Sequence, residues 1–124
     1  MTTKHSPWSV AETVERLRQV LDSRGVTVFA VVDHSGEARA VGLELRDTSV
    51  VIFGSPLAGT PVKQAAPLAA LDLPLKVLVW ADGDQTRIDY TSPSDLAARY
   101  GFDGELAVGL AAIDAVTDAA IASP

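Results

Sequence analysis

The stretch VVIFGSPLAGTPVKQAAPLAALDLPLKVLVW, residues 50–80, constrains the fold of this chain more than any other. It opens with an apolar run that ends at Gly54 and closes with a second apolar run. β-Branched and aromatic residues in both runs predict strands over 49–54 and 75–80. Because binding residues are commonly carried by loops that rigid strands hold in place, we expect a ligand site in the loop after Gly54.

Thr60-Pro61 predicts that a helix begins after this loop. Threonine suits the N-cap, and Pro61 would stand at the first helical position, where its missing N–H costs nothing. Free N–H groups at such a start favour an anionic ligand. Gly54 and Gly59 have the spacing of a phosphate-binding loop, but the lysine that should follow the second glycine is missing, which disfavours nucleotide hydrolysis. The alternative is that both glycines serve tight turns and that Thr60 is only a cap.

Local signals predict most of the remaining elements. Ser9 with Glu12 forms a capping-box pattern, and apolar residues follow at helical spacing, so we expect a helix over 9–24. Residues 26–32 are apolar on both faces, which predicts a strand covered on both sides. We also expect a short edge strand over 5–8, a short helix over 37–45, another from Ser92 through Arg99, and a last helix over 103–122.

Asp82-Gly83 predicts a tight hairpin between strand 75–80 and a strand over 85–90. If these two residues form the loop, Val77 pairs with Ile88, and both face the core. In the same register Lys76 pairs with Asp89 on the other face, and we expect an ion pair there.

The order of elements predicts an α+β fold, in which helices pack on one face of a mostly antiparallel sheet. Alternating strands and helices in the first half keep a flavodoxin-like α/β fold with a parallel sheet as the alternative. At 124 residues, we expect one domain over 1–124.

The composition of the chain limits the kinds of molecule that it is expected to bind. Sixteen acidic against ten basic residues give a net charge of −6, which disfavours nucleic-acid binding over a broad surface. No apolar run approaches the roughly 20 residues that span a bilayer, and the first ten residues lack a signal core. We therefore expect a cytoplasmic chain with no membrane partner. Cysteine is absent and histidine occurs twice, so we expect no metal and no other cofactor.

Asp33-His34, at the end of a predicted strand, is the second place where chemistry is expected. Histidine titrates near neutral pH, and a neighbouring carboxylate orients it or raises its pKa. Adjacent strand residues point to opposite faces, however, so a structural turn role for Asp33 is the favoured interpretation. Lys76 offers a cation for an anionic ligand, and Asp72 would repel one.

Several segments together resemble the domain of unknown function 302 family of bacteria and archaea, over about residues 9–122. They are Asp33-His34, Gly42-Leu43, Ile52-Phe53-Gly54-Ser55-Pro56, Gly59-Thr60-Pro61, Leu71-Asp72-Leu73-Pro74-Leu75-Lys76, and Tyr90 with Pro93, Leu96 and Arg99. The resemblance implies a TATA-box-binding-protein-like fold with extra helices, commonly homodimeric, and no established activity. The chain departs from the family pattern at Ser55 (usually asparagine), Lys63 (usually methionine) and Tyr100 (commonly histidine).

Three functional hypotheses from different classes remain. The first is a homodimeric small-ligand-binding or regulatory module for a small polar or anionic molecule. The second is an enzyme using Asp33, His34 or Lys76, and the third is nucleic-acid binding by fold analogy; both are disfavoured. For the first hypothesis the candidate ligand-binding residues are His34, Gly54, Ser55, Gly59, Thr60, Asp72 and Lys76, and any pocket is expected between Ser55, Gly59, Thr60 and Asp72.

The last predicted helix carries apolar residues beside its main stripe, which favours self-association through that helix. The residues beside the stripe are Val108, Ala112, Ala115, Val116 and Ala119.

Overall fold

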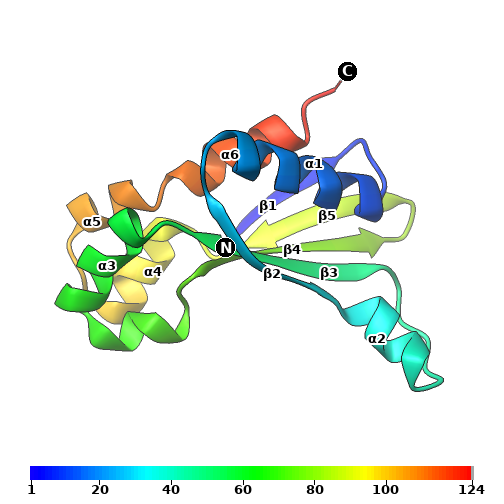
Figure 1. The fold of residues 1–124 in the computed structure, drawn as a ribbon, viewed down its shortest axis with the longest axis horizontal. Helices are drawn as coiled ribbons and strands as arrows, with labels where there is room; N and C mark the ends of the chain where they lie inside the picture. The colour runs from blue at the N-terminus through cyan, green and yellow to red at the C-terminus, as the bar shows by residue number, and fades with distance from the viewer. Residues whose placement is uncertain (124) are drawn as a thin grey trace.

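The computed structural model describes residues 1–123, which form one five-stranded sheet with helices on one face and at one end (Figure 1). The sheet order is β1-β5-β4-β3-β2. Every neighbouring pair is antiparallel, so the α+β prediction is confirmed and the flavodoxin-like alternative is wrong. The strands are β1 (Thr2–Ser6), β2 (Thr27–Asp33), β3 (Thr48–Gly54), β4 (Leu75–Asp82) and β5 (Gln85–Tyr90).

Two helices lie over one face of the sheet, and the others gather at its ends (Figure 1). Helices α1 and α6 cover the face, whereas α3, α4 and α5 lie together beyond one end and α2 projects from the opposite end. Their bounds are α1 (Val10–Ser23), α2 (His34–Ala40), α3 (Pro56–Ala65), a 3₁₀ turn η1 (Pro67–Leu71), α4 (Pro93–Tyr100), α5 (Gly104–Gly109) and α6 (Ala112–Ala120).

The core lies between the sheet and the pair α1 and α6. Burial alternates along β3 and β4, because successive side chains of a strand point to opposite faces. The fully buried aliphatic side chains come from both layers: Leu17, Leu21, Val51, Val62, Val77, Val79, Ile88, Ile113 and Val116.

Capping explains why two helices match their predicted limits. Ser9 Oγ accepts a hydrogen bond from the Glu12 N–H at 3.1 Å, and α1 follows it. Ser92 Oγ accepts from the Asp95 N–H at 3.1 Å, and α4 ends at Gly101, whose φ is +71°. Both signals are local in sequence, so the sequence reveals them.

The hairpin prediction placed the side chains on the correct faces of the sheet but paired the wrong residues across the two strands. Asp82 pairs with Gln85, so the loop is Gly83 and Asp84, and Val79 pairs with Ile88. Gly83 has a φ of +60°, whereas Asp84, like every other non-glycine residue that the structure describes, does not have a positive φ. This is the pattern of a type II′ turn with glycine at its first loop position. The two-residue offset keeps every side chain on its predicted face.

The predicted ion pair between Lys76 and Asp89 is consequently absent from the described residues, because the shifted register moves Asp89 two residues along β4 from Lys76. Lys76 lies opposite Ile52, and Asp89 lies opposite Leu78.

The limits of four other elements differ from those predicted. Helix α3 begins at Pro56 rather than after Thr60, and α2 begins at His34 rather than at residue 37. Strand β1 ends before Pro7, which cannot donate to a ladder. The long last helix is divided into α5 and α6 just after Gly109, a weak helix former.

Strand β2 is an edge of the sheet, which corrects the prediction of a strand covered on both sides. Most of its residues are exposed or half-buried, and Phe29 is 55% exposed. Among residues 1–123, no helix crosses the sheet face opposite α1 and α6, apart from α2 at one end (Figure 1). We call this face the open face, and its apolar residues are Ala30, Val32, Val50, Ile52, Leu78 and Trp80.

A buried carboxylate, Asp89, anchors the β1 side of the open face. Trp80 Nε1 donates to it at 2.8 Å, and Arg87 donates through two nitrogens at 2.9 and 3.1 Å. The Thr3 hydroxyl also donates to Asp89. Burial alone would raise the pKa of Asp89, but the donors from Arg87, Thr3 and Trp80 outweigh burial and hold that pKa below its ordinary value.

Candidate functional site

A cavity of about 330 Å³ lies where the end of β3 and the start of α3 meet the junction of α5 and α6. We call it the apolar pocket. Seven elements besides the connecting loops contribute to it, since α1, β2 and β4 complete the wall. Its characteristic lining residues are Leu21, Phe29, Phe53, Gly54, Lys63 and Val116.

The lining is apolar apart from two side chains. The Ser55 hydroxyl and the Lys63 ammonium are its polar groups, and Lys63 is its one ionisable residue within the described chain. No carboxylate of residues 1–123 lies within 4.0 Å of Lys63. The pocket therefore combines an apolar body with one unpaired cation.

The start of α3 offers fewer backbone donors than the sequence led us to expect. Pro56 has no N–H, and the N–H groups of Ala58 and Gly59 donate to the Ser55 carbonyl at 3.1 and 2.9 Å. An anion at this helix start would thus depend on Lys63 rather than on backbone N–H groups.

Six of the seven predicted binding residues lie at three places in the structure, and Thr60 lies outside all of them. Gly54, Ser55 and Gly59 line the apolar pocket, as expected. Thr60 is exposed inside α3 and does not line it, and neither does Asp72. The expectation that Thr60 and Asp72 line the pocket was therefore wrong, because the helix begins one turn earlier and Asp72 has other partners.

Asp72 and Lys76 lie instead at a second, smaller hollow of about 50 Å³. Asp72 Oδ2 accepts from Arg99 at 2.8 Å and from the Tyr100 hydroxyl. The hydrogen bond from Tyr100, and then that from Arg99, lower the pKa of Asp72, and the same bond raises the pKa of Tyr100. Asp72 thus ties the segment after η1 to α4, and Leu75 separates this hollow from the apolar pocket.

The third place is the start of α2. Asp33 accepts from the Gly36 N–H at 2.9 Å and from Ser35 Oγ at 2.8 Å, and these bonds lower its pKa, Gly36 more than Ser35. Asp33 is therefore the N-cap of α2, which is the favoured structural role. His34 is the first residue of that helix and is exposed.

The residues of the enzyme hypothesis do not come together. Asp33 pairs with Ser49 of β3, while Lys76 pairs with Ile52, three residues further along that strand and on its other side. At about 3.3 Å per residue along a strand and about 4.8 Å between strands, their backbones are more than about 10 Å apart. In residues 1–123, no three His, Asp or Glu side chains are grouped to hold a metal ion.

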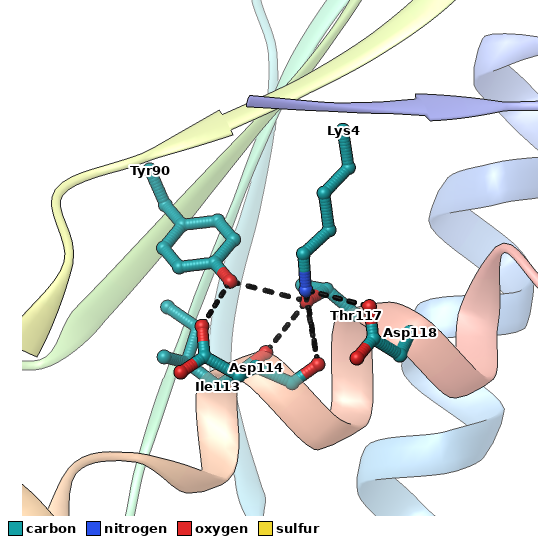
Figure 2. Close-up of polar contacts among 6 residues, drawn as sticks. All are labelled: Lys4, Tyr90, Ile113, Asp114, Thr117 and Asp118. Carbon is teal, nitrogen blue, oxygen red and sulfur yellow. Dashed lines mark hydrogen bonds and ion pairs between the residues drawn. The ribbon is translucent and has the colours of Figure 1, made fainter. Parts of the chain in front are cut away.

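A polar cluster that sequence reasoning missed positions one wall of the pocket (Figure 2). Lys4 of β1 donates to Thr117 Oγ1 at 2.7 Å and to the Asp114 carbonyl at 3.0 Å, and it pairs with Asp118 at 2.8 Å. The Tyr90 hydroxyl donates to the Asp114 carboxylate. Burial, and then the bond to Asp114, raise the pKa of Tyr90. The cluster holds α6 on the sheet, and α6 supplies pocket residues.

The cations named for the nucleic-acid hypothesis are dispersed. Arg87 is engaged by Asp89 at 2.9 Å and by Asp82 at 3.6 Å. Lys76 and Arg87 both lie on the open face, but Arg87 is opposite Trp80, four residues along β4 from Lys76, and Arg39 lies near the end of α2. No helix within residues 1–123 is long and apolar enough to cross a membrane.

The fold and the pocket together define a small α+β module with one apolar site at the end of an antiparallel sheet. The family model described as "Domain of unknown function DUF302" matches residues 2–120, and the chain belongs to that family. The crystal structure of an uncharacterized conserved DUF302 protein from Bacillus stearothermophilus superposes with a TM-score of 0.79 at 22% identity. The match covers 97% of this chain and 94% of that one, and shows the shared fold.

Curated relatives carry the same domain within longer chains. Fluoride-specific ion channel FluC 1 of Brucella suis biovar 1 (strain 1330) is 38% identical over 111 residues, which are 87% of this chain and 44% of that protein. Fluoride-specific ion channel FluC 1 of Brucella abortus biovar 1 (strain 9-941) is also 38% identical, and 41% of its length is covered. The chain spans less than half the length of these relatives.

Proposed function

We propose that this protein is a small-ligand-binding regulatory module that works as a homodimer, with the apolar pocket as its binding site. One observation carries the proposal: a cavity of about 330 Å³ built from seven elements and lined by apolar side chains around a single cation. Small-molecule sites are concave, mostly apolar and fitted with few polar groups. This composition points to a ligand with an apolar body rather than the wholly polar molecule that the loop sequence suggested.

Regulation rather than catalysis fits the chemistry of the lining. Lys63 and Ser55 are its polar side chains, and neither has a hydrogen-bonded partner within residues 1–123 that would activate it. Because the walls come from elements far apart in sequence, an occupied pocket would brace α3 and α6 against the sheet. A ligand bound in this way changes the stability of the surface that a partner contacts.

A thermal-shift screen of small amphipathic compounds tests the proposal. A ligand present at about 100 times its Kd adds about 2.7 kcal/mol of stability, which is a readily measured rise in Tm. The variant Gly59→Leu places a side chain at the pocket, where a Cβ would lie 3.9 Å from Lys63 Cε, and should abolish the rise. Thr60→Leu, on the neighbouring exposed position, is the matched control and should keep it.

Homodimer formation is proposed through the open face rather than through the last helix. Of the five apolar residues expected beside the main stripe of the last helix, Val116 is buried and Ala119 is half-buried. Val108, Ala112 and Ala115 are exposed, but the two on α6 are alanines, which offer little apolar area. The open face lacks a covering layer in the described chain, and the nearby loop after α2 exposes Val41 and Leu43 by 73% and 64%. Apolar surface of this extent marks an interaction site.

Light scattering tests the dimer. The wild-type chain should have twice the 13.0 kDa chain mass at micromolar concentration. Val50→Lys puts a charge at the centre of the open face and should yield the monomer, whereas Leu68→Lys, on exposed η1, should leave the dimer intact. A wild-type monomer, or a dimer that survives Val50→Lys, would contradict this interface.

The curated relatives favour a second candidate, a fluoride-responsive domain that regulates a channel. The observation is the match to proteins named fluoride-specific ion channels, of which this domain is less than half. Fluoride is small and strongly hydrated, and the apolar pocket has few donors to replace its water shell. Thermal shifts in sodium fluoride and sodium chloride separate the candidates. The first predicts equal Tm values, and a fluoride-specific rise would support the second.

A further inference from the structure

We infer that the ligand of the apolar pocket is an amphipathic organic monoanion, such as a medium-chain carboxylate, whose apolar body fills the cavity and whose charged end pairs with Lys63. The inference rests on the proposed binding function of the pocket and names its ligand class. Three features carry it: the isolated charge, the volume, and the way α3 presents the lysine.

The charge in the lining is isolated and positive. Lys63 makes no ion pair with residues 1–123, and the lining contains no Asp or Glu. Three of the ten Lys and Arg side chains, those of Lys4, Arg87 and Arg99, form ion pairs within residues 1–123, and Lys63 is among the other seven. A ligand carboxylate would meet one ammonium group and no repelling carboxylate. Beside apolar walls, where water screens less, such a pair is stronger than on an open surface.

The volume sets the size of the apolar body. At about 30 Å³ for each water in the liquid, a cavity of about 330 Å³ holds about eleven waters. An organic molecule of about ten non-hydrogen atoms fills the same space. Octanoate has this size, with an unbranched apolar tail and one carboxylate. This volume lies at the lower end of the range of small-molecule sites, about 300–1,000 Å³, which favours a small ligand.

The geometry of α3 keeps Lys63 at the pocket. Its neighbour Val62 is fully buried and fixes the inner face of the helix. Gly59 lies one turn before Lys63, and a Cβ there would be 3.9 Å from Lys63 Cε. The lysine stem therefore lies beside a residue that has no side chain of its own. Lys63 lines the pocket and is exposed, an arrangement in which a lysine stem lies along apolar surface and its ammonium group stays in water.

Calorimetric titration with three probes of equal chain length tests the inference: octanoate, octanol and octylamine. In the wild-type protein octanoate should bind about tenfold more tightly than octanol, and octylamine more weakly than either. Lys63→Met keeps the apolar stem and removes the charge. It should lower octanoate affinity to the level of octanol and leave octanol affinity unchanged. Lys76→Met, a cation outside the pocket, should alter none of the three.

The outcomes separate this inference from the proposed function. If octanoate and octanol bind equally in the wild type, or if Lys63→Met changes neither, the assignment of an anionic ligand is overturned and the pocket function stands. If octanoate binds and Gly59→Leu does not weaken it, binding occurs elsewhere and the inference is overturned. If no eight-carbon probe binds the wild type, both the ligand class and the proposed pocket function fall.

Discussion

Asp89→Asn should lower the free energy of unfolding by about 2–3 kcal/mol at neutral pH, because one buried carboxylate serves four donors. Trp80 and Arg87 donate to it at 2.8 to 3.1 Å, and Thr3 completes the set. Asparagine has the same size but one oxygen, and its amide N–H groups would face Arg87. Hydrogen bonds to charged groups contribute about 1.5–3 kcal/mol. Arg87 is 33% exposed, so in the variant its guanidinium group still interacts with water and with Asp82, and this reduces the loss of stability.

The loss of stability in Asp89→Asn should be larger at neutral pH than at acidic pH. The folded-state pKa of Asp89 is held below its ordinary value, against the opposing effect of burial. A carboxylate of this kind contributes stability above its unfolded pKa of about 3.9 and loses it as the pH falls through the folded pKa. The difference between wild type and variant should therefore be full at about pH 7 and shrink below about pH 4.

Urea denaturation followed by circular dichroism at about pH 7, 5, 4 and 3 measures the difference in unfolding free energy between wild type and variant. All samples should have the same protein concentration, because association alters apparent stability. For a chain of this length, 2–3 kcal/mol corresponds to a fall in Tm of about 8–12 °C. Asp84→Asn, in the loop of the same hairpin, is the matched control and should change stability by less than about 0.5 kcal/mol. A loss below about 1 kcal/mol at pH 7, or one that persists unchanged at pH 3, refutes the reasoning.

The remaining predictions concern single positions, each measured by chemical denaturation. Asp33→Ala should cost about 1 kcal/mol, because it removes the cap of α2, while exposed His34→Ala should stay within about 0.5 kcal/mol. Thr60→Ala should also stay within about 0.5 kcal/mol, and a larger loss would mean that Thr60 is a cap. Tyr90→Phe should cost about 1–2 kcal/mol, and a double-mutant cycle with Asp114→Ala should give a coupling of about 1 kcal/mol. No coupling would show that the two groups do not interact.

Sequence reasoning succeeded where the signal is local. The capping serines, Ser9 and Ser92, place α1 and α4 because a capping hydroxyl and the backbone N–H that donates to it are three residues apart. It failed where two local signals compete. Pro56 and Pro61 both suit a first helical position, and the helix begins at the earlier one. Asp82-Gly83 and Gly83-Asp84 both suit a turn, and the positive φ at Gly83 selects the second.

The sequence by itself determined the family, the α+β class, the net charge and most of the strands and helices. Only the tertiary structure decided which residues meet. The position of β1 beside β5 brings Lys4 to Thr117, 113 residues away, and the edge position of β2 leaves Phe29 exposed at the pocket. The physical reason is that apolar periodicity reports how each element is buried, but not which element buries it. Strand order is a property of the packed whole, and it assembles the lining around Lys63 from segments that are distant in the chain.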